Sequence, residues 1–232
     1  MDIRENIEKV QQQIAAAAQA AGRDASEIRL VAVSKTKPPE MVAEAIACGV
    51  TDFGENRPQE LSKKYADFPA ARWHQIGQLQ RNKVKYIIDK AALIHSVDSL
   101  HLAEEIEKQA AKIQKIQDIL IQVNITGEET KSGVSPGETA ALCRAVSTLS
   151  HVRILGLMTI SEAGYSAAEN SAVFQKLKEL SDAIEKERIP GVLMQELSMG
   201  MTHDFQTAIA AGATMVRVGS GIFGARNTEP VK

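Results

Sequence analysis

The chain alternates between short β-type runs and helix-type runs along its whole length. Strand-type runs of β-branched and apolar residues lie at 29–36, 51–55, 72–77, 92–98, 118–125, 153–160, 194–199 and 214–224. Helix-type runs follow all of them but the last, at 38–49, 57–68, 79–90, 99–114, 135–150, 166–187 and 203–212. This alternation predicts a single (β/α)₈ TIM barrel. An open doubly wound sheet is the alternative, but no Gly-x-Gly-x-x-Gly follows the first strand-type run.

The first 22 residues lie outside this alternation. Ile3, Ile7, Val10 and Ile14 repeat at helical spacing and form a narrow apolar stripe. We expect an extra N-terminal helix over 1–22 that packs on the barrel, with a dimer seam as the alternative. No linker, low-complexity tract or change of composition interrupts the sequence, which predicts one domain over 1–232.

Composition and charge exclude several classes of function. The formal net charge is −2, so no basic field favours nucleic acid. No apolar run reaches the length of a membrane span, and the N-terminus lacks the pattern of a signal peptide. Cys48 and Cys143 have no metal-ligand or disulfide spacing, and the histidines are too scattered for a metal site. We therefore expect a cytoplasmic protein, and a monomer because no helix shows a wide exposed apolar face.

Polar and small residues end each predicted strand. In a barrel these positions meet at one mouth, where barrel enzymes have their active sites. Such a ring of polar groups predicts a pocket for a small molecule. The residues are Lys35, Glu55, Asn56, Gly77, Asp98, Asn124, Met158, Thr159, Ser198, Gly219 and Ser220.

Lys35 is the most informative of these positions. It follows Val31 and Val33 at period two, so it leaves the strand on the same face as the two valines. Three roles are open: a solvated rim residue, a phosphate ligand, or an amine that forms a Schiff base with a carbonyl. An apolar setting would disfavour its charged form and leave a nucleophile. Lys37 precedes Pro38, begins the loop and is expected to be solvated.

The loops after the last two strands resemble a phosphate site. They carry Ser198, Gly200, Thr202, Gly219, Ser220 and Gly221. Glycines there allow backbone N–H groups to approach phosphate oxygens, although Gly-Ser-Gly alone is also typical of a simple turn. Arg217 lies in the apolar strand just before and needs a buried partner. A phosphate site beside a reactive lysine describes pyridoxal 5′-phosphate (PLP), whose ring nitrogen an arginine can face.

The motifs VAVSKTKP, DFGENRPQE, WHQIGQLQRNK, GLMTI, LSMGMTHDF and VRVGSGIFGAR resemble the YggS/PROSC family of PLP homeostasis proteins. The resemblance extends from the N-terminal helix to residue 226 and implies a fold like the N-terminal domain of alanine racemase. It implies that Lys35 carries the cofactor as an internal aldimine and that Arg217 faces the pyridine nitrogen. The phosphate contacts that it implies are Ser198, Gly219 and Ser220.

The same resemblance places other residues around the cofactor. Asn56 and Met158 would line the ring, and His74 would lie beneath the cofactor near the barrel floor. The departures are small: Thr202 stands where many relatives have Ser, and Gly221 replaces a commoner Ala. Neither puts cofactor binding in doubt.

The function implied by the resemblance is PLP binding for vitamin B6 homeostasis and supply, with effects on amino-acid pools. PLP-dependent apo-enzymes are the expected recipients, and no robust catalysis is expected. A weak amino-acid racemase with Lys35 as its base is the alternative, and a cofactor-free aldolase is a third hypothesis. A racemase needs two acid/base groups on opposite faces of its substrate. The resemblance to alanine racemase covers only the barrel, and Tyr65, Tyr86 and Tyr165 lie in or beside helix-type runs, so no second base is evident.

Overall fold

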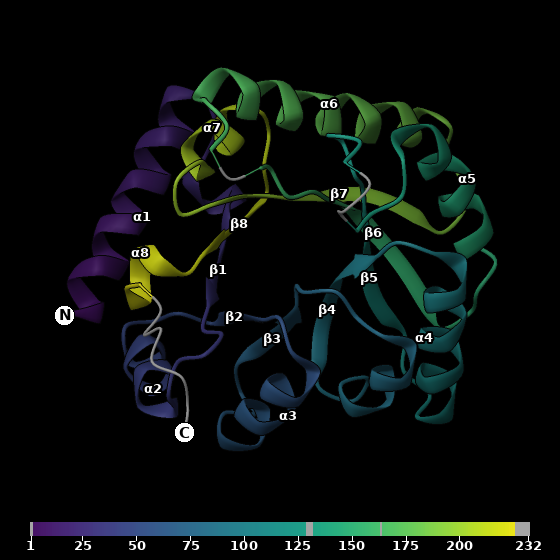
Figure 1. Ribbon diagram of the computed structural model, residues 1–232, viewed down its shortest axis with the longest axis horizontal. Helices are drawn as coiled ribbons and strands as arrows, with labels where there is room; N and C mark the ends of the chain where they lie inside the picture. The colour runs from purple at the N-terminus through teal and green to yellow at the C-terminus, as the bar shows by residue number, and fades with distance from the viewer. Residues whose placement is uncertain (1, 129–131, 163, 226–232) are drawn as a thin grey trace.

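The computed structural model describes residues 2–128, 132–162 and 164–225, and eight parallel strands in it close into a barrel (Figure 1). Each strand pairs with its neighbours in sequence, and β8 pairs with β1. The predicted (β/α)₈ barrel with an extra N-terminal helix is confirmed. The strands are β1 (Arg29–Val33), β2 (Asp52–Glu55), β3 (Arg72–Gln75), β4 (Ala91–Val97), β5 (Gln117–Gln122), β6 (Val152–Met158), β7 (Val192–Met201) and β8 (Met215–Val218).

Helices surround the barrel. The α-helices are α1 (Ile3–Ala20), α2 (Pro39–Ala47), α3 (Pro58–Asp67), α4 (Leu100–Lys112), α5 (Pro136–Val146), α6 (Ala167–Lys186), α7 (Phe205–Ala210) and α8 (Ser220–Phe223), and the 3₁₀ helices are η1 (Ala25–Glu27) and η2 (Arg81–Tyr86). In the part of the chain that the structure describes, no helix is both long and apolar enough to span a bilayer.

Two helical segments differ from the sequence prediction. Within the run at 79–90 the structure has the 3₁₀ helix η2 (Arg81–Tyr86) followed by turns. The buried residues Val84, Ile87 and Ile88 fit a spacing of three as well as of four, so the apolar pattern does not distinguish the two helix types. The last strand, expected to have no helix after it, is followed by α8. Burial of Ile222 and Phe223 draws the Gly-Ser-Gly segment into one helical turn rather than a simple turn.

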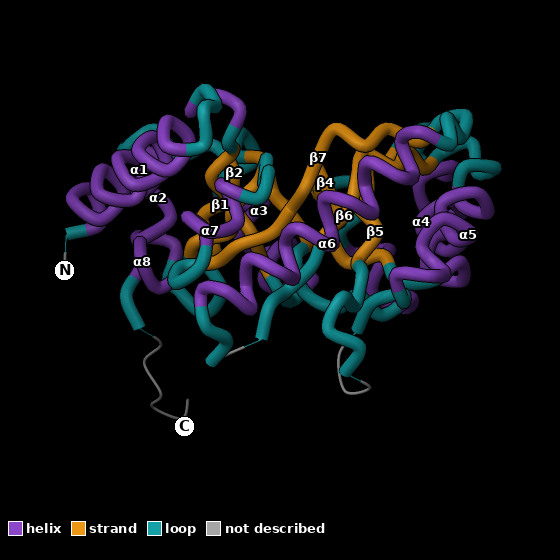
Figure 2. Tube along the Cα trace, turned by 90° about the horizontal axis from the view of Figure 1, so that it is seen from above, coloured by secondary structure: helices purple, strands orange, loops and turns teal. Residues whose placement is uncertain are grey.

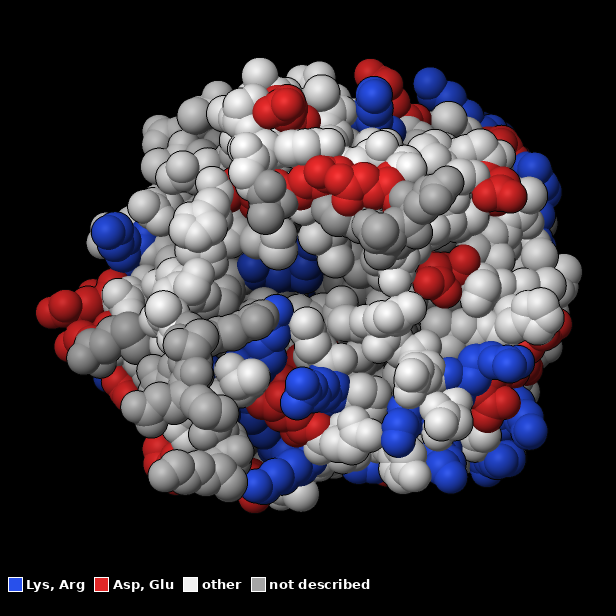
Figure 3. All heavy atoms as spheres, viewed as in Figure 1, with Lys and Arg blue, Asp and Glu red and all other residues white. Residues whose placement is uncertain are grey.

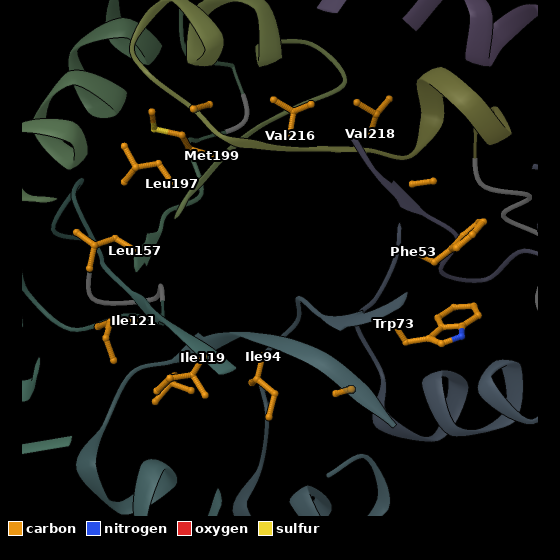
Figure 4. Packing of buried hydrophobic residues seen from close by; sticks show 14 of the residues in the cluster. Phe53, Trp73, Ile94, Ile119, Ile121, Leu157, Leu197, Met199, Val216 and Val218 are labelled. Atoms are coloured by element: carbon orange, nitrogen blue, oxygen red, sulfur yellow. The ribbon is translucent and has the colours of Figure 1, made fainter. Parts of the chain in front are cut away.

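Strand side chains alternate between the barrel interior and the helices. The outward-facing ones form the main apolar core (Figure 4), where the rings of Phe53 and Trp73 lie 5.4 Å apart. A smaller apolar cluster lies apart from this core and consists of Leu93, Leu120, Met158 and Met215. The rest of the interior contains buried polar groups, so the barrel is strongly packed outside and partly polar inside.

The N-terminal helix buries its apolar stripe within the chain. Ile3, Ile7, Val10 and Ile14 are at most 5% exposed, and α1 contacts α2, α7 and α8 (Figure 1). The side chain of Asp2 caps the helix by accepting a hydrogen bond from the backbone N–H of Glu5 at 3.1 Å. The stripe is therefore occupied by the chain's own helices.

Gly156 in β6 allows a close approach between two strands. A Cβ at this position would lie 1.8 Å from the backbone oxygen of Glu196 in β7, far inside van der Waals contact. The β6–β7 register shifts between Ile154 and Gly156. Only a residue without a side chain fits at this irregularity.

Gly156→Ala is expected to destabilise the fold by about 1–3 kcal/mol or more, because the strands must move apart to admit the methyl group. Urea unfolding measures the effect. Gly137→Ala in the first turn of α5 is the matched control, since nothing lies within 4 Å of its Cβ position. The control should be neutral or stabilising, and equal effects of the two substitutions would contradict the steric argument.

Candidate functional site

A cavity of about 570 Å³ opens at the carboxyl ends of the strands. The loops that follow the strands gather on one side of the barrel, the lower side of Figure 2. Figure 3 looks at this face and shows a central hollow with blue Lys and Arg atoms in it. Five predicted site residues line the cavity: Lys35, Asn56, Arg217, Gly219 and Ser220.

The cavity lining is positively charged. Lys35, Lys37 and Arg217 contribute cationic side chains, and no Asp or Glu is among the described residues that line it. Gln122 and Asn124 add polar residues to the lining. Such a lining selects a ligand with negative charge.

Lys35 lies in a turn whose backbone is unusual. The strand ends at Val33, and Thr36 has a φ of 63°, a left-handed conformation that residues other than glycine seldom adopt. The backbone N–H of Thr36 donates to Oε1 of Glu60 at 2.6 Å. The backbone N–H of Lys37 donates to the carbonyl oxygen of Ser34 at 3.0 Å. These contacts hold the turn so that Lys35 faces the cavity.

A buried ion pair behind the barrel wall supports the same turn. Nζ of Lys64 donates to the carbonyl oxygen of Ser34 and to Oε1 of Glu55, both at 2.7 Å, and to Glu60 at 2.9 Å. Ser34 also donates its hydroxyl to Oε1 of Glu55 at 2.7 Å. Burial raises the pKa of Glu55, although Lys64 opposes the shift. One lysine thus connects β1, β2 and α3 beneath the Lys35 turn.

Lys64→Met is expected to destabilise the protein by about 3–5 kcal/mol, because it leaves Glu55 buried without its cation. Chemical unfolding measures this loss. Lys63→Met is the control, since Lys63 is the exposed neighbour on α3. The double change Lys64→Met with Glu55→Leu should recover much of the loss, and a Lys64→Met variant as stable as the control would contradict the assignment.

Arg217 lies at the bottom of the cavity and is only 4% exposed. Its Nη1 donates to Oγ of Ser198 at 2.6 Å, and its Nη2 donates to the carbonyl oxygen of Thr159 at 2.8 Å. Burial lowers the pKa of Arg217 to about 10, while Asp204 opposes the shift. The guanidinium therefore remains charged at neutral pH.

Hydrogen bonds continue from Arg217 down through the barrel. Oγ of Ser198 is 2.8 Å from Nδ1 of His95, Nε2 of His95 is 2.9 Å from Nδ1 of His74, and Nε2 of His74 is 2.9 Å from Oδ1 of Asp52. We call Asp52, His74, His95, Ser198 and Arg217 the polar column. Burial lowers the pKa of His74, and it lowers that of His95 further, with His74 and Arg217 adding to the effect.

The free energy of unfolding should therefore fall as the pH decreases below about 6.5. Both histidines have folded pKa values below the ordinary value, so under acid conditions the unfolded chain binds protons that the folded chain does not. Each histidine contributes at most about 1.4 kcal/mol per pH unit, until its folded pKa is reached. Their contribution to stability is complete above pH 6.5.

Urea unfolding between pH 8 and 5 tests this dependence. His95→Gln should reduce the slope, whereas His101→Gln should leave it nearly unchanged because His101 is exposed. A free energy of unfolding that does not change between pH 7 and 5 would contradict the prediction that His74 and His95 are buried in their neutral forms.

The loops after β7 and β8, next to the end of β1, carry hydroxyl and glycine groups at the cavity. Oγ of Ser220 donates to Oγ1 of Thr202 at 3.2 Å, and the backbone N–H of Gly221 donates to the same oxygen at 3.3 Å. A Cβ on Gly219 would lie 3.3 Å from the backbone oxygen of Val33, so the glycine permits a tight approach between β8 and β1. Small groups at this side leave room for a bulky polar ligand.

Three predicted site residues lie below the cavity rather than in its lining. Ser198 is fully buried beneath Arg217, and His74 lies two hydrogen bonds deeper. Met158 belongs to the small inner cluster with Leu93 and Met215. The structure thus divides the predicted set into five lining residues and three supporting ones.

Sequence reasoning did not single out His95 or Asp52. Both lie on inward-facing strand positions, His95 two residues after the inward-facing Leu93 and Asp52 at the start of β2. Period-two alternation, applied to every strand and not only to the strand ends, would have identified them. Within the described residues, no cluster of His, Cys, Asp and Glu could hold a metal ion.

Comparisons with known proteins find similar chains over nearly the whole length. The model of the family described as alanine racemase, N-terminal domain, matches residues 3–227. A pyridoxal phosphate homeostasis protein of Aquifex aeolicus is 44% identical over 228 residues, which cover 97% of this chain and 99% of the relative. A protein of the same name from Escherichia coli K12 is 40% identical, with 97% of each chain covered.

Solved structures show the same barrel. PipY of Synechococcus elongatus, solved with PLP bound, superposes with a TM-score of 0.85 at 35% identity and covers 96% of this chain and 100% of its own. An unknown protein from Bifidobacterium adolescentis has a TM-score of 0.89 at 37% identity, with 96% and 94% covered. An alanine racemase of Clostridium difficile shares the fold at 15% identity and a TM-score of 0.77, over 98% of this chain but 58% of its own.

Proposed function

We propose that this chain, which belongs to the alanine racemase N-terminal domain family and within it to the pyridoxal phosphate homeostasis proteins, binds PLP at the mouth of its barrel. The observation that carries the proposal is one cationic cavity that brings together Lys35, the buried Arg217 and the Gly219–Ser220 segment. The PLP-bound structure of PipY supports it.

The residues present fit this cofactor. PLP is anionic, and the described lining contains cations and hydroxyls but no carboxylate. The Gly219–Ser220 segment with Thr202 provides small groups and hydroxyl donors suited to a phosphate. Asn56 lines the cavity where it can contact the ring.

Lys35 is proposed as the covalent anchor. PLP supplies an aldehyde for this lysine and an aromatic ring that can withdraw electrons. As a neutral amine, Lys35 would attack the aldehyde carbon through Nζ. The carbonyl oxygen would leave as water with the two amine hydrogens, so that a C=N double bond would replace the C=O double bond. Water would regenerate the aldehyde and the free lysine, and another amine would replace Lys35 on that carbon. The chain therefore limits free aldehyde while keeping the cofactor releasable.

Arg217 explains why holding is favoured over catalysis. A guanidinium that donates but does not give up its proton keeps a facing ring nitrogen unprotonated, which weakens the ring as an electron acceptor. A racemase also needs a second acid/base group, and no tyrosine is among the described residues that line the cavity. Racemisation with Lys35 as base is accordingly proposed as weak at most.

We further propose a cytoplasmic monomer of one barrel domain that supplies PLP to apo-enzymes. Cys48 and Cys143 are free thiols, and burial raises the pKa of Cys143 to about 12, as suits an inert thiol in a reducing compartment. The apolar stripe of α1 is buried within the chain, which leaves it unavailable to a second copy. These features support the proposal.

Absorption spectroscopy with peptide mapping tests the PLP proposal. PLP added to the purified chain should give a visible band that borohydride removes, and the pyridoxyl mass should map to Lys35. Lys35→Ala should abolish both, and Lys37→Ala should retain them because Nζ of Lys37 donates to the carbonyl oxygen of Ala225. Label scattered over surface lysines would contradict the site. Loss of optical rotation from L-alanine at an enzymatic rate would favour the racemase instead.

A further inference from the structure

The polar column crosses the barrel from end to end. Its members come from five strands, β2, β3, β4, β7 and β8, and none is more than 4% exposed. Arg217 lines the cavity at the mouth, whereas Asp52, Arg29 and Arg72 line a second cavity at the amino ends of the strands. The column therefore connects the two ends through the interior.

The lower end determines the direction of every hydrogen bond. Asp52 is 3.4 Å from Nε of Arg72 and 3.8 Å from Nε of Arg29, and Oγ1 of Thr51 donates to it at 2.7 Å. Burial opposes ionisation of Asp52, but hydrogen bonds from His74 and Thr51 and the nearby charges lower its pKa. An ionised carboxylate only accepts, so Nε2 of His74 must carry a proton.

The other links follow in turn. A neutral His74 with its proton on Nε2 accepts at Nδ1, so His95 must donate from Nε2. His95 then accepts at Nδ1 from the hydroxyl of Ser198. The oxygen of Ser198 is left to accept from Nη1 of Arg217. The reverse order would place an unprotonated Nε2 of His74 against the carboxylate of Asp52.

We propose that His95 and His74 are positioning residues for Arg217. With Asp52 they hold the Ser198 hydroxyl as an acceptor and fix the guanidinium at the bottom of the cavity. Hydrogen bonds in such a chain polarise one another, so the charge of Asp52 strengthens the acceptor that faces Arg217. No carboxylate among the described residues accepts a hydrogen bond from Arg217 directly. The polar column thus connects Arg217 through hydrogen bonds to the negative charge of Asp52.

The role in cofactor binding rests on the proposed function. If Arg217 faces the ring nitrogen of PLP, the column sets the position of that contact. Loss of His95 should then weaken binding and change the protonation of the bound cofactor, although His95 does not touch it.

Two measurements on the full chain without cofactor test the column itself. Histidine ¹⁵N NMR at pH 7 should show both His74 and His95 as neutral Nε2–H tautomers. The Nη resonances of Arg217 should be separate in the wild-type chain, because two hydrogen bonds slow rotation of the guanidinium. They should merge in His95→Leu and stay separate in His95→Gln, whose amide can both accept and donate.

A third measurement uses PLP as the probe. His95→Leu should weaken PLP binding about tenfold, the effect of leaving one buried polar group unsatisfied, and should shift the pH midpoint of the visible band. His95→Gln should restore both. Leu93→Met is the packing control, since Leu93 is the preceding inward-facing residue of β4 and has no hydrogen bond to lose. A merely structural role would give the two β4 variants, His95→Leu and Leu93→Met, the same spectrum.

The outcomes separate the two proposals. Nδ1–H tautomers, or separate Arg217 resonances in His95→Leu, would overturn the column. An unchanged midpoint in a His95→Leu chain that binds PLP would overturn its role toward the cofactor. If the cofactor-free results hold but the wild-type chain does not bind PLP, the proposed function fails and the positioning of Arg217 stands.

Discussion

The buried charge of Arg217 is the constraint on which the rest of the site depends. A guanidinium inside a barrel is costly unless its donors are satisfied and a countercharge is connected to it. Ser198 and the carbonyl of Thr159 satisfy two donors, Asp204 is the acidic group that offsets the burial of the charge, and Asp52 lies at the far end of the polar column. The inner apolar cluster stays small because polar groups occupy much of the remaining interior.

Lys35 depends on a separate arrangement outside the barrel wall. Lys64 and Glu55 lie between the sheet and α3, where they hold the turn after β1. Arg217 is instead held by Ser198 and the carbonyl of Thr159 inside the barrel. Lys35 and Arg217, two of the cations that line the cavity, are thus supported from opposite sides of the barrel wall.

The sequence was sufficient to predict the barrel and the lining residues Lys35, Arg217 and Ser220, because strand ends in a barrel converge at one mouth. The sequence did not show how deep in the barrel each side chain lies. Ser198 ends a predicted strand run, yet strand tilt and the irregular β7–β8 register place it beneath Arg217. His95 was overlooked because alternation was applied only to the strand ends, and its link to partners 21 and 103 residues away in sequence leaves no local signal. The helix α8 was missed because Gly-Ser-Gly is typical of a turn, while its helical state depends on burial of Ile222 and Phe223.

The polar column also limits how this chain can change in length. A one-residue insertion or deletion within a strand turns every following side chain to the other face. Such a change in β2, β3, β4, β7 or β8 would remove one link and leave its neighbours buried and unsatisfied. We therefore expect insertions and deletions to be tolerated in the loops but not within these five strands. Related chains should therefore differ in size at the loops and helices, with β2, β3, β4, β7 and β8 keeping their spacing.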